Sequence, residues 1–145
     1  MSVNAIATAR MLGGTEILGI DIKSDRDLEK AIVQGLPPDA VALVVGLIYP
    51  GQTDKFYEVV PRSTLIRRQK EGSLLSTEES QKAERLARVF SFAVEVWGNE
   101  EGAREFMQKA HPMLEDRTPF EASLNELGAR QVEQILGRLM FGISG

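Results

Sequence analysis

Basic side chains gather in one short segment of an otherwise acidic chain. Residues 62–70 contain Arg62, Arg67, Arg68 and Lys70 with no acidic residue until Glu71, whereas the whole chain has a net charge of −4 and a pI of about 5.1. Guanidinium and ammonium groups on one face of a helix bind the phosphates that line a DNA groove. The segment therefore predicts a local patch for an anionic partner, without a general attraction for nucleic acid.

A helical wheel indicates which of these side chains face outward. At about 100° per residue, Leu65, Ile66 and Gln69 share one side of such a helix. The opposite arc and the first residue of the segment supply the candidate DNA-binding residues Arg62, Ser63, Thr64, Arg67, Arg68 and Lys70. We expect Thr64 and Arg67 to lie nearest the base edges and the other basic side chains to contact phosphates. The alternative interpretation is an ordinary solvated helix face.

The remaining polar residues give neither a catalytic arrangement nor a metal site. The chain has no cysteine, and its one histidine, His111, falls in a predicted loop, which is a poor basis for metal binding. The paired carboxylates Glu78-Glu79 and Glu100-Glu101 fall in the first turns of predicted helices, where capping and the helix dipole explain them. We therefore expect no enzyme activity, no cofactor and no metal.

Length and composition indicate a folded domain in the cytoplasm. The 145 residues are 43% hydrophobic and 26% charged, which suffices for a core. The first 20 residues lack the basic region and long apolar region of a signal peptide. No apolar run approaches the roughly 20 residues that cross a bilayer, so we expect a cytoplasmic protein without membrane association.

Helix start and stop signals recur in the first half of the chain. Ser24 with Asp27 predicts a helix that Gly35 ends, and Pro38 suits the first turn of a second helix that runs to about Ile48. The valines of that second segment make a strand the competing interpretation, but no alternating segment lies nearby to pair with it. For the first 20 residues the sequence is consistent with either a loose arm or a short packed segment.

Two short helices follow the break at residues 49–51. The first covers residues 54–58 and starts from Thr53, residues 59–61 form a tight turn, and the basic segment forms the second helix. This order is typical of a helix-turn-helix, in which the second helix presents its outer face to DNA.

Capping signals predict only helices in the second half, so the fold class is all-α. Helices are expected from Ser76 to Trp97, from Asn99 to about Ala110, from Thr118 to Leu127, and after Gly128. The first of these carries a second apolar stripe, Val89, Phe92 and Val96, which we predict to be an interface with a second copy or a partner, with plain core as the alternative. Trp97 and Leu139 are expected in the core.

The order of these segments resembles the Xre/MbcA/ParS family of type II antitoxins over about four-fifths of the chain. The collinear stretches are GLPPDAV, RSTLIRRQKEGSLLSTEES, ERLARVF, VWGNEEGAREFM and TPFEASLNELGARQVEQILGRLMFG. The last resembles the closing signature of the family: Pro, then Gly, then Val, then Leu, then Gly. Departures are Phe106-Met107 where Trp-Leu is common, Pro61 in the turn before the basic helix, and residues 115–117 in place of a glycine-rich segment.

The resemblance implies a Cro/Xre-like helix-turn-helix followed by a small helical toxin-binding domain. The expected divisions are an N-terminal arm at residues 1–20, a DNA-binding domain at 21–75 and a toxin-binding domain at 76–145. The implied function is neutralisation of a small toxin, often of the NAD-depleting RES type, with repression of the protein's own operon. A homodimer that forms a hetero-oligomer with the toxin is expected. The alternative is a stand-alone helix-turn-helix regulator whose C-terminal half only dimerises.

Toxin binding is expected chiefly at the end of the chain. Apolar Phe141 and Ile143 alternate there with flexible glycines, so we predict that residues 141–145 enter or cover the active site of the toxin. A chain terminus after a helix is ordinarily frayed, which is the alternative interpretation. The candidate toxin-binding residues are Arg138, Phe141, Gly142, Ile143, Ser144 and Gly145. The stripe of Val89, Phe92 and Val96 then serves as the dimer or toxin interface.

Overall fold

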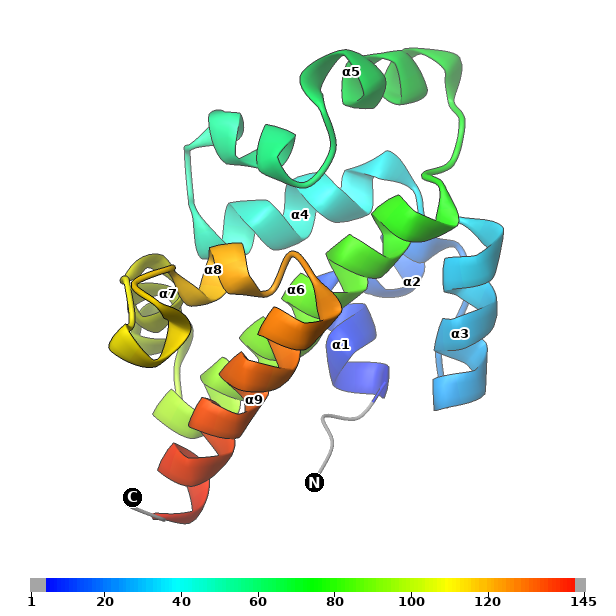
Figure 1. The fold of residues 1–145 in the computed structure, drawn as a ribbon. Coiled ribbons are helices and arrows are strands. Elements are labelled where there is room, and N and C mark those ends of the chain that lie inside the picture. The colour runs from blue at the N-terminus through cyan, green and yellow to red at the C-terminus, as the bar shows by residue number, and fades with distance from the viewer. Residues whose placement is uncertain (1–4, 143–145) are drawn as a thin grey trace.

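The computed structural model describes residues 5–142, and this part of the chain contains helices and no strand (Figure 1). The prediction of an all-α fold is confirmed. The elements are α1 (Ala5–Met11), α2 (Gly14–Leu18), α3 (Asp25–Gln34), α4 (Pro38–Ile48), the 3-10 helix η1 (Thr53–Glu58), α5 (Arg62–Glu71), α6 (Thr77–Trp97), α7 (Glu100–Gln108), the 3-10 helix η2 (Pro112–Leu114), α8 (Pro119–Ala122) and α9 (Glu126–Phe141).

The long helix α6 is the centre of the fold. It begins with a capping box, in which the Ser76 side chain accepts from the Glu79 N–H at 3.1 Å and the Glu79 carboxylate accepts from the Ser76 N–H at 2.8 Å. It packs against α1, α3, α4, α7 and α9. Leu86 and Phe90 are fully buried between these helices. One core therefore runs through both halves of the chain, and the predicted division at residue 75 falls just before the helix that they share.

The segment that begins at Pro38, whose sequence carries both strand and helix signals, forms the helix α4. Its valines and Ile48 are fully buried, so the β-branched side chains serve a helix that is enclosed by its neighbours. Pro38 occupies the first turn, where its missing N–H costs nothing. The Leu36 N–H donates to the buried Ser80 hydroxyl at 2.9 Å, which ties the start of α4 to α6.

The start of the chain is packed from residue 5 onward. Ala5, Ala9 and Leu12 are buried, and α1 lies directly against α6. The small alanine side chains let the two helix backbones come close. Of the alternatives for this segment, the packed one holds for α1 and α2. No single helix within residues 5–142 is both long and apolar enough to cross a bilayer.

Candidate functional site

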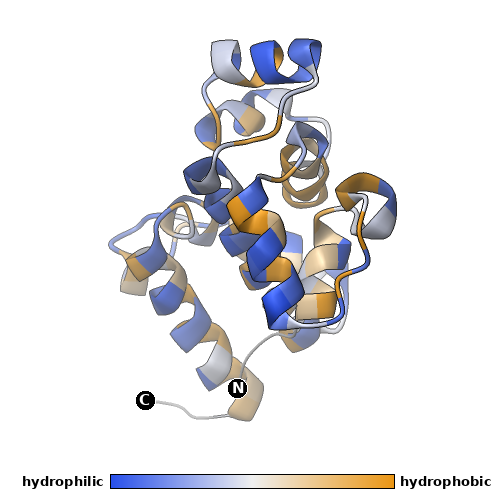
Figure 2. Cartoon of the chain, turned by 90° about the vertical axis from the view of Figure 1, so that its right-hand side faces the viewer, coloured by the Kyte–Doolittle hydropathy of each residue, from blue (hydrophilic) through white to orange (hydrophobic). Residues whose placement is uncertain are grey.

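The helix α5 projects from one end of the molecule, opposite to the C-terminal end of α9 (Figure 1). It packs against α4 and η1, and its one buried residue is Leu65. Val59 and Val60 are buried in the turn before it, which fixes α5 relative to η1. Figure 2 shows α5, at the top, as mostly hydrophilic. The helix thus offers most of its circumference to solvent.

Four of the predicted DNA-binding residues lie fully at this surface. Arg62, Ser63, Arg67 and Lys70 are exposed, whereas Thr64 is half-buried. The Arg62 guanidinium lies 5.9 Å from the centre of the Tyr57 ring in η1, a distance at which the cation and the ring attract each other. The exposed basic side chains form a patch, Arg62, Arg67 and Lys70, that is held on a fixed helix.

The fourth basic side chain, Arg68, faces the protein, and its predicted place on the exposed arc is wrong. Its Nε lies 2.9 Å from Oε1 of Glu79, its Nη2 donates to Oε2 of the same carboxylate at 3.3 Å, and its Nη1 donates to the Leu74 carbonyl at 3.2 Å. The inward side of α5 is centred on Leu65 and Arg68, three residues apart. Ile66, which the wheel placed inward, is 44% exposed.

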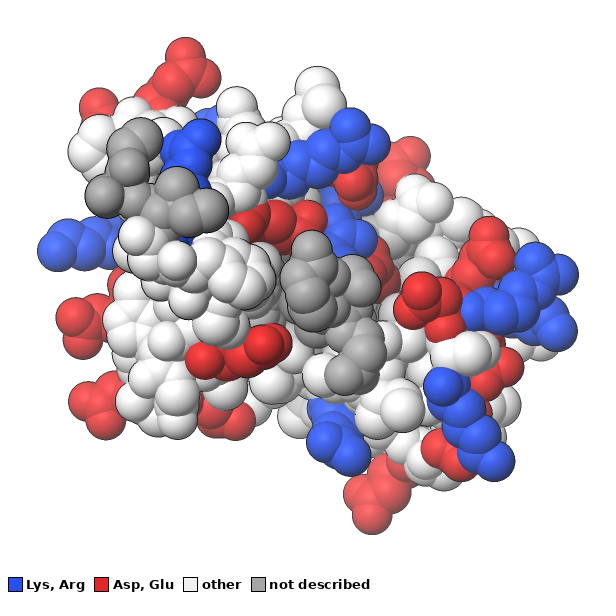
Figure 3. All heavy atoms as spheres, turned by 90° about the horizontal axis from the view of Figure 1, so that it is seen from below, with Lys and Arg blue, Asp and Glu red and all other residues white. Residues whose placement is uncertain are grey.

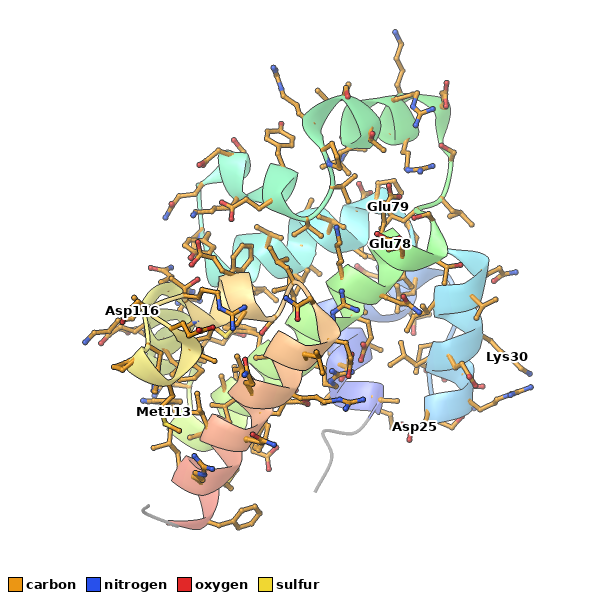
Figure 4. The ribbon with its side chains drawn as sticks, viewed as in Figure 1. Asp25, Lys30, Glu78, Glu79, Met113 and Asp116 are labelled. Carbon is orange, nitrogen blue, oxygen red and sulfur yellow. The ribbon has the colours of Figure 1, made fainter. Side chains whose placement is uncertain are left out.

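The Glu79 carboxylate makes two kinds of interaction at the start of α6, directly beneath the end of α5 (Figure 4). Burial alone would raise the pKa of this carboxyl, but the Ser76 N–H and the Arg68 guanidinium outweigh burial and hold the pKa below its usual value. The same carboxylate caps α6 and binds the helix that carries the basic patch. The orientation of α5 therefore depends on an ion pair that spans 11 residues of sequence.

Replacement of Glu79 by Gln is expected to lower the free energy of unfolding by about 1–2 kcal/mol at pH 7. A carboxyl with a lowered pKa in the folded state adds stability above its unfolded pKa, and this contribution disappears as the pH falls through the folded pKa. The original protein and the Glu79→Gln variant should therefore differ less in their free energies of unfolding, measured by urea denaturation, as the pH falls from 7 towards 3. Glu78→Gln is the matched control, since Glu78 shares the first turn of α6 and is exposed. Equal losses for the two variants would contradict the role of the Arg68–Glu79 pair.

A second surface lies at the far end of α6, where the chain turns into α7. Trp97 and Phe106 pack with ring centres 4.9 Å apart, and the His111 ring meets Phe106 edge-on at 6.4 Å. These rings line a pocket of about 550 Å³ together with Gly102, Glu105, Lys109, Ala110 and Pro112. We call this site the aromatic pocket. The expectation that Trp97 lies in the core is wrong, because its side chain is 38% exposed.

The aromatic pocket has its shape because Gly102 faces the Trp97 ring. A Cβ at Gly102 would lie 2.7 Å from Cδ1 of Trp97, too close for both groups to stay in place. The Asn99 side chain caps α7 by accepting from the Gly102 N–H at 2.7 Å, which fixes this glycine beneath the indole. His111 Nδ1 accepts from the Met113 N–H at 3.1 Å, which orients the imidazole ring.

The predicted partner stripe on α6 lies mostly inside the single chain. Val89 is fully buried and Phe92 almost so, since they pack in the core that α6 shares with its neighbours, and only Val96 is half-exposed. Leu139, expected in the core, is instead 52% exposed near the end of α9. The apolar surface of this half therefore comes from helix ends, which a wheel drawn for α6 alone does not reveal.

The end of α9 carries three of the predicted toxin-binding residues. Phe141 is 63% exposed, and Arg138 and Gly142 are also exposed. The other three, Ile143, Ser144 and Gly145, lie outside the described residues. Seen from below, acidic and basic side chains are interspersed on the molecule, with broad uncharged areas between them (Figure 3). This face differs from the basic patch on α5.

Ion pairs that the sequence did not reveal hold α9 against α6. Arg88 lies 3.0 Å from both Glu84 and Glu133 and 3.7 Å from Glu126. Burial raises the pKa of Glu84 despite the adjacent guanidinium, and attraction by the three carboxylates outweighs burial and raises the pKa of Arg88. The four-residue spacing of Glu84 and Arg88 was the available signal.

Side chains of α7 also complete the end of α4. Arg104 Nε donates to the Leu47 carbonyl at 2.8 Å, and Gln108 Nε2 donates to the Ile48 carbonyl at 2.7 Å. The last carbonyls of a helix lack partners within that helix, so these bonds anchor α7 to the N-terminal half. Residues 5–142 contain no group of acidic or histidine side chains that could hold a metal ion.

Comparison with known proteins matches part of this structure to a described domain. Residues 92–142 match the model of the Antitoxin Xre/MbcA/ParS C-terminal toxin-binding domain. Antitoxin Xre of Yersinia enterocolitica serotype O:8 / biotype 1B (strain NCTC 13174 / 8081) is 32% identical over 85 residues, which are 58% of this chain and 57% of the relative. The chain thus spans little more than half the length of this curated relative. The matched domain includes the whole aromatic pocket and all of α9.

Proposed function

We propose that this chain is a member of the Xre/MbcA/ParS antitoxin family, which the match of residues 92–142 and the 32% identity to an Antitoxin Xre support. It is then a non-enzymatic antitoxin that binds and neutralises a RES-type, NAD-depleting toxin and represses its own operon. The observation that carries the proposal is the match of residues 92–142 to a toxin-binding domain. The same stretch exposes large apolar side chains, Trp97, Leu139 and Phe141. Exposed apolar residues in one domain are typical of a surface that binds another protein.

DNA binding is proposed for the outer face of α5. Arg62, Arg67 and Lys70 are exposed on a helix that the core holds in place through Leu65. In a helix-turn-helix the second helix enters the major groove, and dimers bind two half-sites. We therefore propose that a homodimer places two copies of α5 on the operator, with Arg67 nearest the bases. Arg68 instead holds the inward side of α5 to α6 through its ion pair with Glu79.

Neutralisation is proposed to involve the end of the chain beyond α9. Deletion of residues 141–145 should abolish protection when the chain is co-expressed with the toxin, because it removes the segment that is proposed to enter or cover the active site of the toxin. Phe141 is 63% exposed, so the described core should lose little by the deletion. Growth of the host after toxin induction is the measurement. Phe141→Ala is the milder companion variant and should protect only in part.

Circular dichroism must first establish that the shortened chain keeps its helices and its melting temperature. Full protection by a folded chain that lacks residues 141–145 would contradict this role of the segment. Protection by neither the full chain nor the shortened one would contradict the antitoxin function itself.

A further inference from the structure

We infer that the aromatic pocket at Trp97, Phe106 and His111 receives an apolar side chain of the toxin. This inference rests on the proposed function and names a surface for it that is separate from residues 141–145. All residues that line the pocket fall between positions 97 and 112. They therefore lie within the part of the chain that matches a toxin-binding domain, which favours a toxin as the occupant over DNA or a small ligand.

The pocket is formed before any partner arrives. The Trp97 and Phe106 rings pack against each other with 33° between their planes, and Gly102 leaves the space that this arrangement needs. The Asn99 cap and the bond from Met113 to His111 fix the backbone on both sides. A binding site that is already ordered loses little conformational entropy on association.

The chemistry of the pocket indicates one apolar anchor with polar surroundings. Aromatic rings form its walls, and the volume of about 550 Å³ suffices for one large side chain. Glu105 and Lys109 lie at the pocket, are exposed, and have no ion-pair partner within residues 5–142. Tryptophan is among the residues that contribute most to protein interfaces when a partner buries it within a polar rim.

Trp97 provides a direct probe because it is the one tryptophan of the chain. The full chain labelled with 5-fluorotryptophan should give one fluorine NMR signal, which reports this pocket alone when the unlabelled toxin is added. The probe protein is the product of the gene next to that of this chain. We expect the signal to move and broaden as the complex forms. A complex in which the signal stays in place would overturn the inference, since the indole would then keep its surroundings.

Affinity measurements give a second test that does not depend on the label. Trp97→Ala and Phe106→Ala should each weaken toxin binding by about 30-fold or more. Gly102→Ala should weaken binding as well, because its Cβ displaces the indole. The control is Leu127→Ala, which removes another exposed apolar side chain of the matched domain, 70% exposed and outside the pocket, and should change affinity less than threefold.

The outcomes separate the inference from the proposed function. Equal affinity for the original chain and for folded pocket variants would refute the role of the pocket and leave the antitoxin function standing. Loss of self-association by the pocket variants without loss of toxin binding would assign the pocket to a second copy of this chain, and the inference would again be wrong. Absence of any complex with the original chain would contradict the proposed function.

Discussion

Replacement of Gly128 by Ala is expected to destabilise the protein by about 3 kcal/mol or more. Gly128 lies in the first turn of α9, where its N–H donates to the Asn125 cap at 2.8 Å. An added Cβ would overlap the Ala122 carbonyl oxygen and lie 2.7 Å from the Ala122 carbonyl carbon. Because these atoms belong to the backbone at the end of α8, no side chain can rotate away. The packing of α8 against α9 must open instead.

The same substitution at Gly137 is the matched control. Gly137 lies in the same helix, and a Cβ there meets no atom within 4 Å. Alanine is favoured over glycine in a helix by about 1 kcal/mol, so Gly137→Ala should stabilise the protein slightly. Thermal unfolding should therefore show a fall of about 10 °C for the first variant and a small rise for the second. A melting temperature that is unchanged in Gly128→Ala would contradict the contact between α8 and α9.

Removal of the basic patch is expected to weaken operator binding by about 100-fold or more. The variant replaces Arg62, Arg67 and Lys70 with Ala. Their side chains are exposed and separate from the core, so the protein should remain folded. If two of the three contact phosphates, the slope of log affinity against log salt should also fall in magnitude by about two. Titration of DNA from upstream of the protein's own gene, at several salt concentrations, measures both quantities.

A control with the same loss of charge distinguishes a DNA-reading surface from bulk electrostatics. Arg10, Arg26 and Lys30 are exposed on α1 and α3, and Figure 4 shows Lys30 on α3, well away from α5. Replacement of these three by Ala removes the same number of positive charges and should change affinity less than about threefold. Equal weakening by the two triple variants would contradict the assignment of α5 to DNA.

Features set by neighbours in sequence could be predicted from the chain alone. The caps at Ser24, Ser76, Asn99 and Thr118 are bonds between residues three apart, and all four occur as expected. The helical state of α4 could also be predicted from the sequence, since no neighbouring segment had the alternating pattern of a partner strand. Such interactions depend on the local backbone and on residue type.

Features that depend on tertiary packing were missed. The wheel of α5 could not show that Arg68 turns inward, because that choice requires Glu79 to be positioned by the start of α6. The burial of Val89 and the exposure of Trp97 depend on where α7 and α9 cover α6. Gly102 and Gly128 are likewise explained by backbone or rings that come close only in the folded chain. The features that give this protein its particular chemistry therefore depend on tertiary packing, and the sequence alone did not reveal them.

The basic patch and the aromatic pocket lie at opposite ends of α6. The basic patch on α5 is bound to the first turn of α6 through Glu79, and the aromatic pocket forms where α6 ends at Trp97. Between these two sites the inward side of α6 is buried in the core. Variants at one end should therefore leave binding at the other end intact, which allows each proposal to be tested in a folded protein.

Co-purification with the product of the neighbouring gene, followed by measurement of the mass of the complex, tests whether this chain is an antitoxin. We expect a stable assembly that contains both proteins, with a mass equal to a whole number of copies of each. Recovery of this chain alone, from cells in which the neighbouring protein is abundant and folded, would contradict the antitoxin function.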